Sequence, residues 1–156
     1  MGRRVSSDLD ALEDWAAPLL ERLQPGERKK LARDIARELR KRQAARIKRQ
    51  KNPDGSPFEP RKPQARAQSG SIRRKAMFTK IRQAKFLKGR GQGDAATVGF
   101  SGRVARIARA HQRGLREKVD RSGPWYDYPE RELIGYSDDD RAVIRDMILD
   151  RLGSEL

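Results

Sequence analysis

The 156-residue sequence contains no cysteine and a single histidine, and aromatic residues make up only 6% of it. Without cysteine the chain can form no disulfide bond, thiolate metal site or cysteine nucleophile. Hydrophobic residues account for 35% of the chain, against about 45–50% in ordinary globular domains. No run approaches the ~20 apolar residues of a membrane-spanning helix, and the N-terminus lacks the apolar region of a signal peptide. We therefore expect a soluble protein with a modest core and no membrane partner.

The few residues that could carry catalysis give it little support. His111 lies on the apolar face of a predicted helix, and no Ser or Asp is spaced from it in a way that indicates a catalytic triad. We interpret it as a structural residue, because buried polar groups are normally hydrogen-bonded. The acidic run at 138–140 follows Ser137 and is better explained by a helix N-terminus than by a metal site, because negative charge is favourable there. We expect no enzymatic activity, no metal and no cofactor.

Positive charge, by contrast, is abundant, with 37 Lys and Arg against 22 Asp and Glu and a net charge of +15. Residues 25–51 contain twelve basic and three acidic residues, and residues 52–93 contain eleven and two, so each segment carries +9. The two ends, residues 1–24 and 124–156, are acidic. This distribution suits head-to-tail self-association, in which the acidic ends of one copy contact the basic middle of the next, at least as well as it suits nucleic-acid binding.

Helical spacing of the apolar residues predicts five amphipathic helices. Ser7 and Ser137 are predicted N-caps, the second in a capping box with Asp140. Pro18 is expected to kink or split the first helix, and Gly114 to end the fourth. The predicted helices begin and end near residues 7 and 23, 25 and 51, 71 and 87, 103 and 111, and 137 and 152.

Strand signals are fewer. Residues 96–100 form the best strand pattern, and weaker patterns occur at 78–81 and 132–136. We interpret three further segments as loops: a mobile loop at 65–70, a glycine-rich connector at 89–94 and an irregular loop at 117–128. Together these elements predict an α+β fold, in which amphipathic helices pack on a small antiparallel sheet, with a long basic helix and mobile loops. We expect a single domain, with an N-terminal helical part (1–51), a proline-rich turn and loop (52–70) and an α+β body (71–156).

The most distinctive segment is residues 52–63, in which four of twelve residues are proline. Proline fixes φ and removes a backbone donor, and the Asp54-Gly55 pair favours a tight turn. Neither a helix nor a regular strand can continue through this segment. The long basic helix before it must therefore end here.

Six short landmarks follow one another along the chain, and each is weak alone. They lie at residues 15–20 (WAAPLL), 50–55 (QKNPDG), 77–78 (MF), 98–100 (VGF), 108–114 (ARAHQRG) and 129–131 (PER). In this order they closely resemble the virion morphogenesis, or tail completion, proteins of contractile-tailed bacteriophages and related prophages. The resemblance covers nearly the whole chain. It departs from the family pattern at Arg113, where members tend to carry an aromatic residue after the His-Gln pair.

The resemblance implies a structural protein of the neck, or head–tail junction, that completes the tail and allows head and tail to join. It implies a homo-oligomeric ring, taken here as hexameric, that contacts other phage neck and tail proteins in the virion after assembly in the host cytoplasm. No cofactor is implied. The family-motif candidates for assembly are Asn52, Pro53, Asp54, Gly55, Ser56, His111, Gln112, Gly114, Pro129 and Arg131.

The basic helix leaves two interpretations open. Its exposed face could contact a partner ring or DNA in the lumen, or the chain could be a sequence-independent nucleic-acid-binding protein. The sequence has no zinc pattern, helix-turn-helix spacing or paired stacking aromatics that would favour the second interpretation. The candidate residues of this face are Arg37, Arg40, Lys41, Arg46, Lys48 and Arg49.

Overall fold

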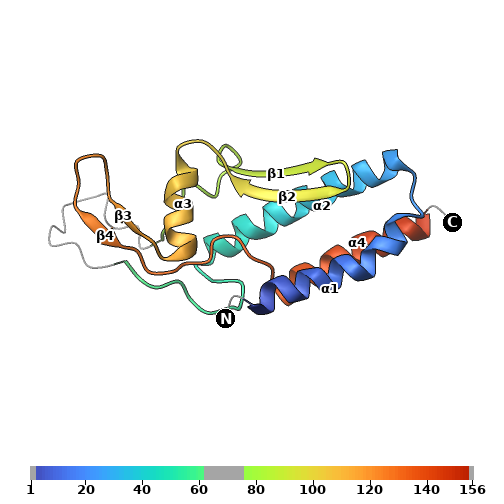
Figure 1. The fold of residues 1–156 in the computed structure, drawn as a ribbon, viewed down its shortest axis with the longest axis horizontal. Helices are drawn as coiled ribbons and strands as arrows, with labels where there is room; N and C mark the ends of the chain where they lie inside the picture. The colour runs from blue at the N-terminus through green and yellow to red at the C-terminus, as the bar shows by residue number, and fades with distance from the viewer. Residues whose placement is uncertain (1–2, 62–75, 155–156) are drawn as a thin grey trace. The chain divides into compact units, whose positions relative to one another are not determined.

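The computed structural model describes residues 3–61 and 76–154 of the chain (Figure 1). Within these residues the fold is α+β, as the sequence predicts, with four helices and two separate two-stranded antiparallel sheets in place of a single sheet. The helices are α1 (Arg3–Leu20), α2 (Pro25–Lys48), α3 (Val104–Arg113) and α4 (Asp138–Ser154). The strands are β1 (Leu87–Gln92), β2 (Ala95–Phe100), β3 (Arg116–Lys118) and β4 (Trp125–Asp127).

The chain divides into two compact units, each built from segments that are distant in sequence. Unit 1 takes residues 1–42, 88–99 and 135–156, and unit 2 takes residues 43–87 and 100–134, in both cases as far as the structure describes them. The long helix α2 and the β1–β2 hairpin contribute residues to both units. The single domain expected from the sequence stays a prediction.

Unit 1 is held together by the apolar faces of three helices. In Figure 1, α1 and α4 lie side by side, and the β1–β2 hairpin lies along α2. The apolar spacing that predicts these helices places their hydrophobic residues in one buried cluster, to which β2 adds the half-buried Val98. The buried members of this cluster are Leu12, Ala16, Leu23, Leu31, Leu39, Ile144 and Ile148.

The helix ends agree with the sequence prediction at α4 and differ at α1. At α4 the Ser137 Oγ accepts a hydrogen bond from the Asp140 N–H at 3.0 Å, and an Asp140 carboxylate oxygen accepts one from the Ser137 N–H at 3.0 Å. This confirms the capping box. Helix α1, however, begins at Arg3, so Ser7 lies inside the helix rather than capping it. Pro18 does not split α1, because it lies in the last turn, where the missing donor costs one hydrogen bond and the helix ends two residues later.

The glycine-rich segment that the sequence indicates as a connector is strand β1. Alternation along the strand turns Gly89 and Gly91 towards α2. A Cβ atom on Gly89 would lie 2.4 Å from the backbone oxygen of Ala36, and one on Gly91 would lie 2.5 Å from the backbone nitrogen of Arg33. The connector prediction is wrong because these glycines permit a close approach between strand and helix. A propensity scale rates glycine as a poor strand residue and does not take this packing into account.

The structure confirms the prediction of α3 and overturns four others. Gly114 ends α3 in the left-handed conformation, with φ 60°. Residues 117–128 contain the β3–β4 hairpin, in which Glu117 pairs with Tyr126, so the irregular-loop prediction is wrong. Residues 76–86 form turns, so the described part of the predicted 71–87 helix is not helical, and neither 78–81 nor 132–136 is a strand. Residues 71–75 and the loop predicted at 65–70 lie outside the described residues.

A second apolar cluster forms the core of unit 2. Its buried members come from α2, the segment after it, residues 76–86, α3 and the segment before α4. The half-buried Phe78, Ile81 and Phe100 pack against them. Among residues 3–61 and 76–154, no helix combines the length and apolar character needed to cross a membrane. The buried members of this cluster are Ile47, Phe58, Met77, Ala108 and Leu133.

Candidate functional site

The turn at residues 52–56 is closed by its own polar groups. The Asn52 N–H donates to the Ser56 carbonyl at 2.8 Å, and the Gly55 N–H donates to the Asn52 carbonyl at 3.0 Å. Gly55 adopts φ 88°, which side-chain-bearing residues rarely adopt. Hydrogen bonds from the Ser56 hydroxyl and N–H hold the pKa of the Asp54 carboxyl below its ordinary value. Pro53 completes the turn, which stops α2 as the sequence predicts.

The irregular segment at residues 131–134 has no strand partner, and buried side chains bind its backbone instead. Arg46 of α2 donates to the carbonyl of Glu132 at 3.0 Å and to that of Leu133 at 2.7 Å. The same guanidinium donates to the Lys51 carbonyl at 2.9 Å and to the side-chain oxygen of Gln43. The side chain of Arg46 is therefore committed to the interior of unit 2. With 6% of its surface exposed, it is not part of an exposed basic face, and that sequence expectation is wrong for this residue.

Two motif amides bind the same segment from other sides. The side-chain oxygen of Asn52 accepts the Glu132 N–H at 2.9 Å. Gln112 makes a reciprocal pair with the backbone of Ile134, donating to its carbonyl at 2.7 Å and accepting its N–H at 2.9 Å. These side chains supply the hydrogen bonds that a neighbouring strand would otherwise provide.

Arg131 is the centre of the network, and only 3% of its surface is exposed. Its Nε donates to the Glu59 carbonyl at 2.7 Å, and one terminal nitrogen donates to the Pro60 carbonyl at 3.1 Å. The other terminal nitrogen lies 3.0 Å from Nδ1 of His111. Because arginine has only donors, Nδ1 of His111 must be the acceptor. Arg131 therefore joins the proline-rich segment to α3.

The ring of His111 is also enclosed by aromatic side chains. It makes edge contacts with Phe78 and Tyr128, with ring centroids 4.7 and 4.8 Å apart. Burial, together with the positive charges of Arg131 and Arg61, lowers the pKa of His111 to about 4. The ring is therefore neutral at pH 7, as its role as an acceptor requires.

Gly114 sets the path of the chain beside this network. A Cβ atom at this position would lie 3.2 to 3.3 Å from the backbone and Cβ of Glu130 and from the carbonyl of Tyr128. Its positive φ adds a second reason for glycine. Pro129, between these two neighbours, is half-buried. The turn at 52–56, the end of α3 and the segment at 129–134 thus come together in unit 2. We call these three interacting segments the motif network.

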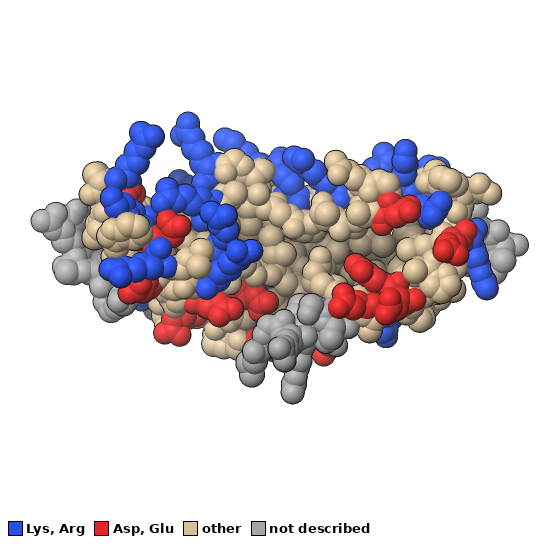
Figure 2. Space-filling model, viewed as in Figure 1, with Lys and Arg blue, Asp and Glu red and all other residues tan. Residues whose placement is uncertain are grey.

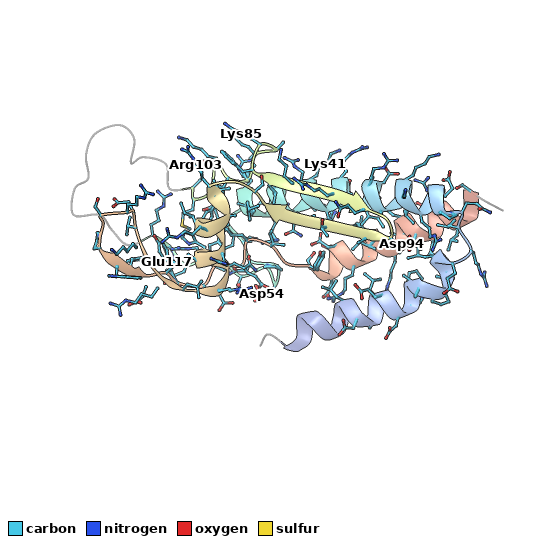
Figure 3. All side chains as sticks on the ribbon, turned by 45° about the horizontal axis from the view of Figure 1, so that its top comes forward. Lys41, Asp54, Lys85, Asp94, Arg103 and Glu117 are labelled. Carbon is cyan, nitrogen blue, oxygen red and sulfur yellow. The ribbon has the colours of Figure 1, made fainter. Side chains whose placement is uncertain are left out.

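The other candidate residues lie on α2, and three of its arginines contribute to a groove. Arg37, Lys41, Lys48 and Arg49 are exposed, and Arg40 is half-buried. In unit 1 an open groove of about 390 Å³ runs between α2 and β1; Figure 3 shows Lys41 of α2 near β1. We call it the arginine groove. It is lined by Arg33, Arg37, Arg40, Gly89, Arg90, Gly91 and Gln92.

Comparison with known proteins identifies the family to which the chain belongs. The model of the phage virion morphogenesis family matches residues 7–153. The chain belongs to this family. It is 36% identical over 148 residues to tail completion protein S of Escherichia phage P2, an alignment that covers 94% of this chain and 98% of the phage protein. No solved structure matches the chain.

In this member of the virion morphogenesis family, the landmarks distant in sequence meet in space. Asn52 and Gln112 bind the backbone of Glu132 and Ile134, and Arg131, at the start of that segment, binds the carbonyls of Glu59 and Pro60. Sequence reasoning missed the roles of Gln43 and Arg46, because a basic residue in a basic helix gives no local sign of burial. The sequence indicates the burial of Arg46 only through its position, because Gln43, Arg46 and Ile47 lie on the same side of α2 at helical spacing.

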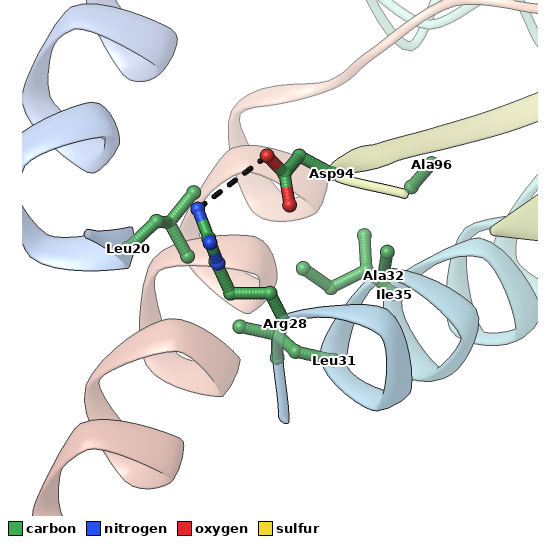
Figure 4. Close-up of a pocket in the computed structure, with 7 residues that line it drawn as sticks. All are labelled: Leu20, Arg28, Leu31, Ala32, Ile35, Asp94 and Ala96. Carbon is green, nitrogen blue, oxygen red and sulfur yellow. Dashed lines mark hydrogen bonds and ion pairs between the residues drawn. The ribbon is translucent and has the colours of Figure 1, made fainter. Parts of the chain in front are cut away.

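Unit 1 also contains a smaller pocket. In unit 1 a pocket of about 50 Å³ lies between apolar residues of α2 and the hairpin, beside the Arg28–Asp94 ion pair at 3.5 Å (Figure 4). Organic ligands generally occupy about 300–1,000 Å³, so this pocket is too small for one. Within the described residues, no group of three or more His, Cys, Asp and Glu side chains is arranged to hold a metal ion.

The neutral His111 predicts a pH dependence of stability. An unfolded histidine has a pKa of about 6.5, whereas the folded value is about 4. Between these values the unfolded chain binds a proton that the folded chain does not, so stability falls as the pH is lowered from 6.5 to 4. His111→Gln keeps an acceptor for Arg131 and cannot titrate. Urea unfolding measured at pH 7 and at pH 4.5 should show that this variant loses less free energy of unfolding between the two pH values than the wild type does. Equal losses would contradict the conclusion that His111 is neutral in the folded protein.

Proposed function

We propose that this chain is a structural tail completion protein that acts at the head–tail junction, where it completes the tail and allows the head to join. In this proposal it is assembled in the host cytoplasm, remains in the neck of the virion and functions as a hexameric ring. The observation that carries the proposal is the similarity to tail completion protein S over 94% of this chain. Nearly full coverage of both chains means that the similarity does not rest on one shared segment.

The geometry of the motif network supports a structural role over a catalytic one. His111, the only histidine, is neutral and has its Nδ1 occupied by Arg131. A general base needs an available nitrogen within reach of a substrate proton. Asn52, Gln112 and Arg131 are occupied with backbone groups of the same chain. Asn52, Gln112 and Arg131 therefore fix the shape of unit 2, whereas Asp54, Gly55 and Ser56 of the turn are exposed and accessible to a partner.

Deletion of the gene from the phage or prophage that carries it tests the proposal. We expect plaque titre to fall by several orders of magnitude, and electron microscopy of the lysate to show DNA-filled heads and tails that are not joined. Expression of the wild-type protein from a plasmid should restore joined particles. Mass spectrometry of purified restored virions should detect the chain.

Two results would contradict this proposal. Joined, infectious particles in the absence of the protein would exclude a required role in tail completion. Empty heads with normally joined tails would instead favour the alternative function, nucleic-acid binding that is independent of sequence. The arginine groove gives that alternative its structural basis, because arginine side chains bind phosphate as well as carboxylate.

A further inference from the structure

Unit 1 carries a concentration of positive charge in the arginine groove. Arg33, Arg37 and Arg40 lie three and four residues apart, so they follow one another along one side of α2 over about 10 Å. Arg90 of β1 also lines the groove. Arg33 and Arg90 are exposed and form no ion pair with any residue the structure describes. The close packing of Gly89 and Gly91 against α2 holds the two walls of the groove together.

The same unit carries unpaired negative charge on α1 and α4. Several carboxylates on these helices are exposed and form no ion pair within residues 3–61 and 76–154. In Figure 2 a group of Asp and Glu side chains lies over the region of α1, and Lys and Arg side chains lie along the edge formed by α2 and β1. We call these carboxylates the acidic face: Asp10, Asp14, Asp139, Asp146 and Asp150.

The two charged surfaces lie on opposite sides of one core. Leu31 and Leu39 of α2 are buried against α1 and α4, and Arg33, Arg37 and Arg40 are displaced from them by about half a helical turn. On α4 the buried Ile144 and Ile148 are likewise opposite the exposed Asp146 and Asp150. The groove and the acidic face of one copy therefore cannot contact each other.

We infer that the arginine groove of one copy binds the acidic face of the next copy, and that this contact joins copies of the chain head to tail. Two different surfaces that complement each other make a heterologous contact, which forms a ring when the rotation between copies closes. Arginine suits a contact with carboxylates because its planar guanidinium can donate two parallel hydrogen bonds to one carboxylate. The inference rests on the ring in the proposed function and names the surfaces that form it.

The structure favours a second copy over nucleic acid as the occupant of the groove. The lining residues include no aromatic side chain on which a base could stack. Nucleic acid would also leave the acidic face without a partner, whereas a second copy neutralises both surfaces.

Charge reversal on each surface, followed by mixing, tests the inference. One variant carries Arg33→Glu and Arg90→Glu, and the other carries Asp146→Lys and Asp150→Lys. Light scattering on nucleic-acid-free protein should show that each reversal raises the concentration for half-assembly by about a hundredfold or more, because like charges then meet across the contact. The two reversals are also complementary to each other, so in an equimolar mixture both kinds of contact join opposite charges, and the mixture should regain the assembly that neither variant shows alone.

A matched control variant and three possible outcomes test whether the arginine groove binds the acidic face of another copy. Arg103→Glu with Arg109→Glu makes the same change in net charge at two exposed positions outside the groove, and should assemble as the wild type does. The inference fails if both surface variants keep the wild-type mass. It also fails if the groove variant keeps that mass and loses salt-dependent retention of double-stranded DNA, because the groove then binds phosphate. A wild type that stays monomeric at all concentrations overturns the ring and this contact together, while the deletion phenotype still tests tail completion separately.

Discussion

Replacement of Arg46 by alanine is expected to lower the free energy of unfolding by about 3–5 kcal/mol. The guanidinium binds the carbonyls of Glu132 and Leu133 and the side chain of Gln43. Removing it leaves these buried acceptors without donors and opens a space next to Ile47, which is fully buried. Loss of a buried charged group with several partners belongs to the costliest class of single substitutions. Equilibrium unfolding in urea measures the change.

The same helix provides the controls for this prediction. Arg49→Ala removes an equal charge from an exposed position and should change the free energy of unfolding by less than about 0.5 kcal/mol. Arg46→Lys keeps the charge but cannot reproduce the forked set of donors, so its stability should lie between those of wild type and Arg46→Ala. If Arg46→Ala is no less stable than Arg49→Ala, then the backbone of residues 131–134 is not held by Arg46.

Replacement of Gly89 by alanine should destabilise unit 1 by about 1–3 kcal/mol. The added Cβ would lie 2.4 Å from the Ala36 carbonyl oxygen and 2.9 Å from its carbon, which are backbone atoms within α2. The helix or the strand must shift to accept the methyl group, and overpacking of this kind typically costs about that amount. The sign of the effect is informative, because alanine within a strand is otherwise more stable than glycine by roughly 0.5–1 kcal/mol.

Gly99 of the neighbouring strand β2 is the matched control. A Cβ atom there meets nothing within 4 Å, and its φ is not in the positive range. Gly99→Ala should therefore leave thermal stability unchanged or raise it slightly, while Gly89→Ala lowers it. Equal stabilities of the two variants would show that β1 does not pack closely on α2, and the arginine groove would lose the contact that holds its walls together.

The burial of the motif network changes how the family resemblance is interpreted. Asn52, Gln112 and Arg131 bind backbone groups within unit 2, so each has a structural role there, and a direct role in partner contacts stays a prediction. Surfaces that bind other subunits need exposed residues, such as Arg33 and Arg90 in the groove. The landmarks that make the sequence recognisable as a family member and the residues that we propose to join its copies are therefore largely different.

Local signals in the sequence were sufficient for α2, α3, α4 and β2. Apolar spacing, the Ser137 and Asp140 capping box, and Gly114 at the end of α3 act within a few residues, so their effect can be predicted without the rest of the fold. The proline-rich turn also follows from its own residues. The identity of the family likewise came from the sequence, because the order of its landmarks does not depend on where they lie in space.

Tertiary structure alone decided that residues 87–92 form β1 and that Arg46 is buried. Gly89 and Gly91 form a strand because they fit against α2, and Arg46 is buried because residues 132–133, far along the chain, place their carbonyls around it. Propensity scales describe a residue and its neighbours in sequence, whereas these features depend on backbone groups 50 to 90 residues away. Such contacts form only once the chain has folded, which is why the sequence showed a basic helix and the structure showed which of its arginines are buried.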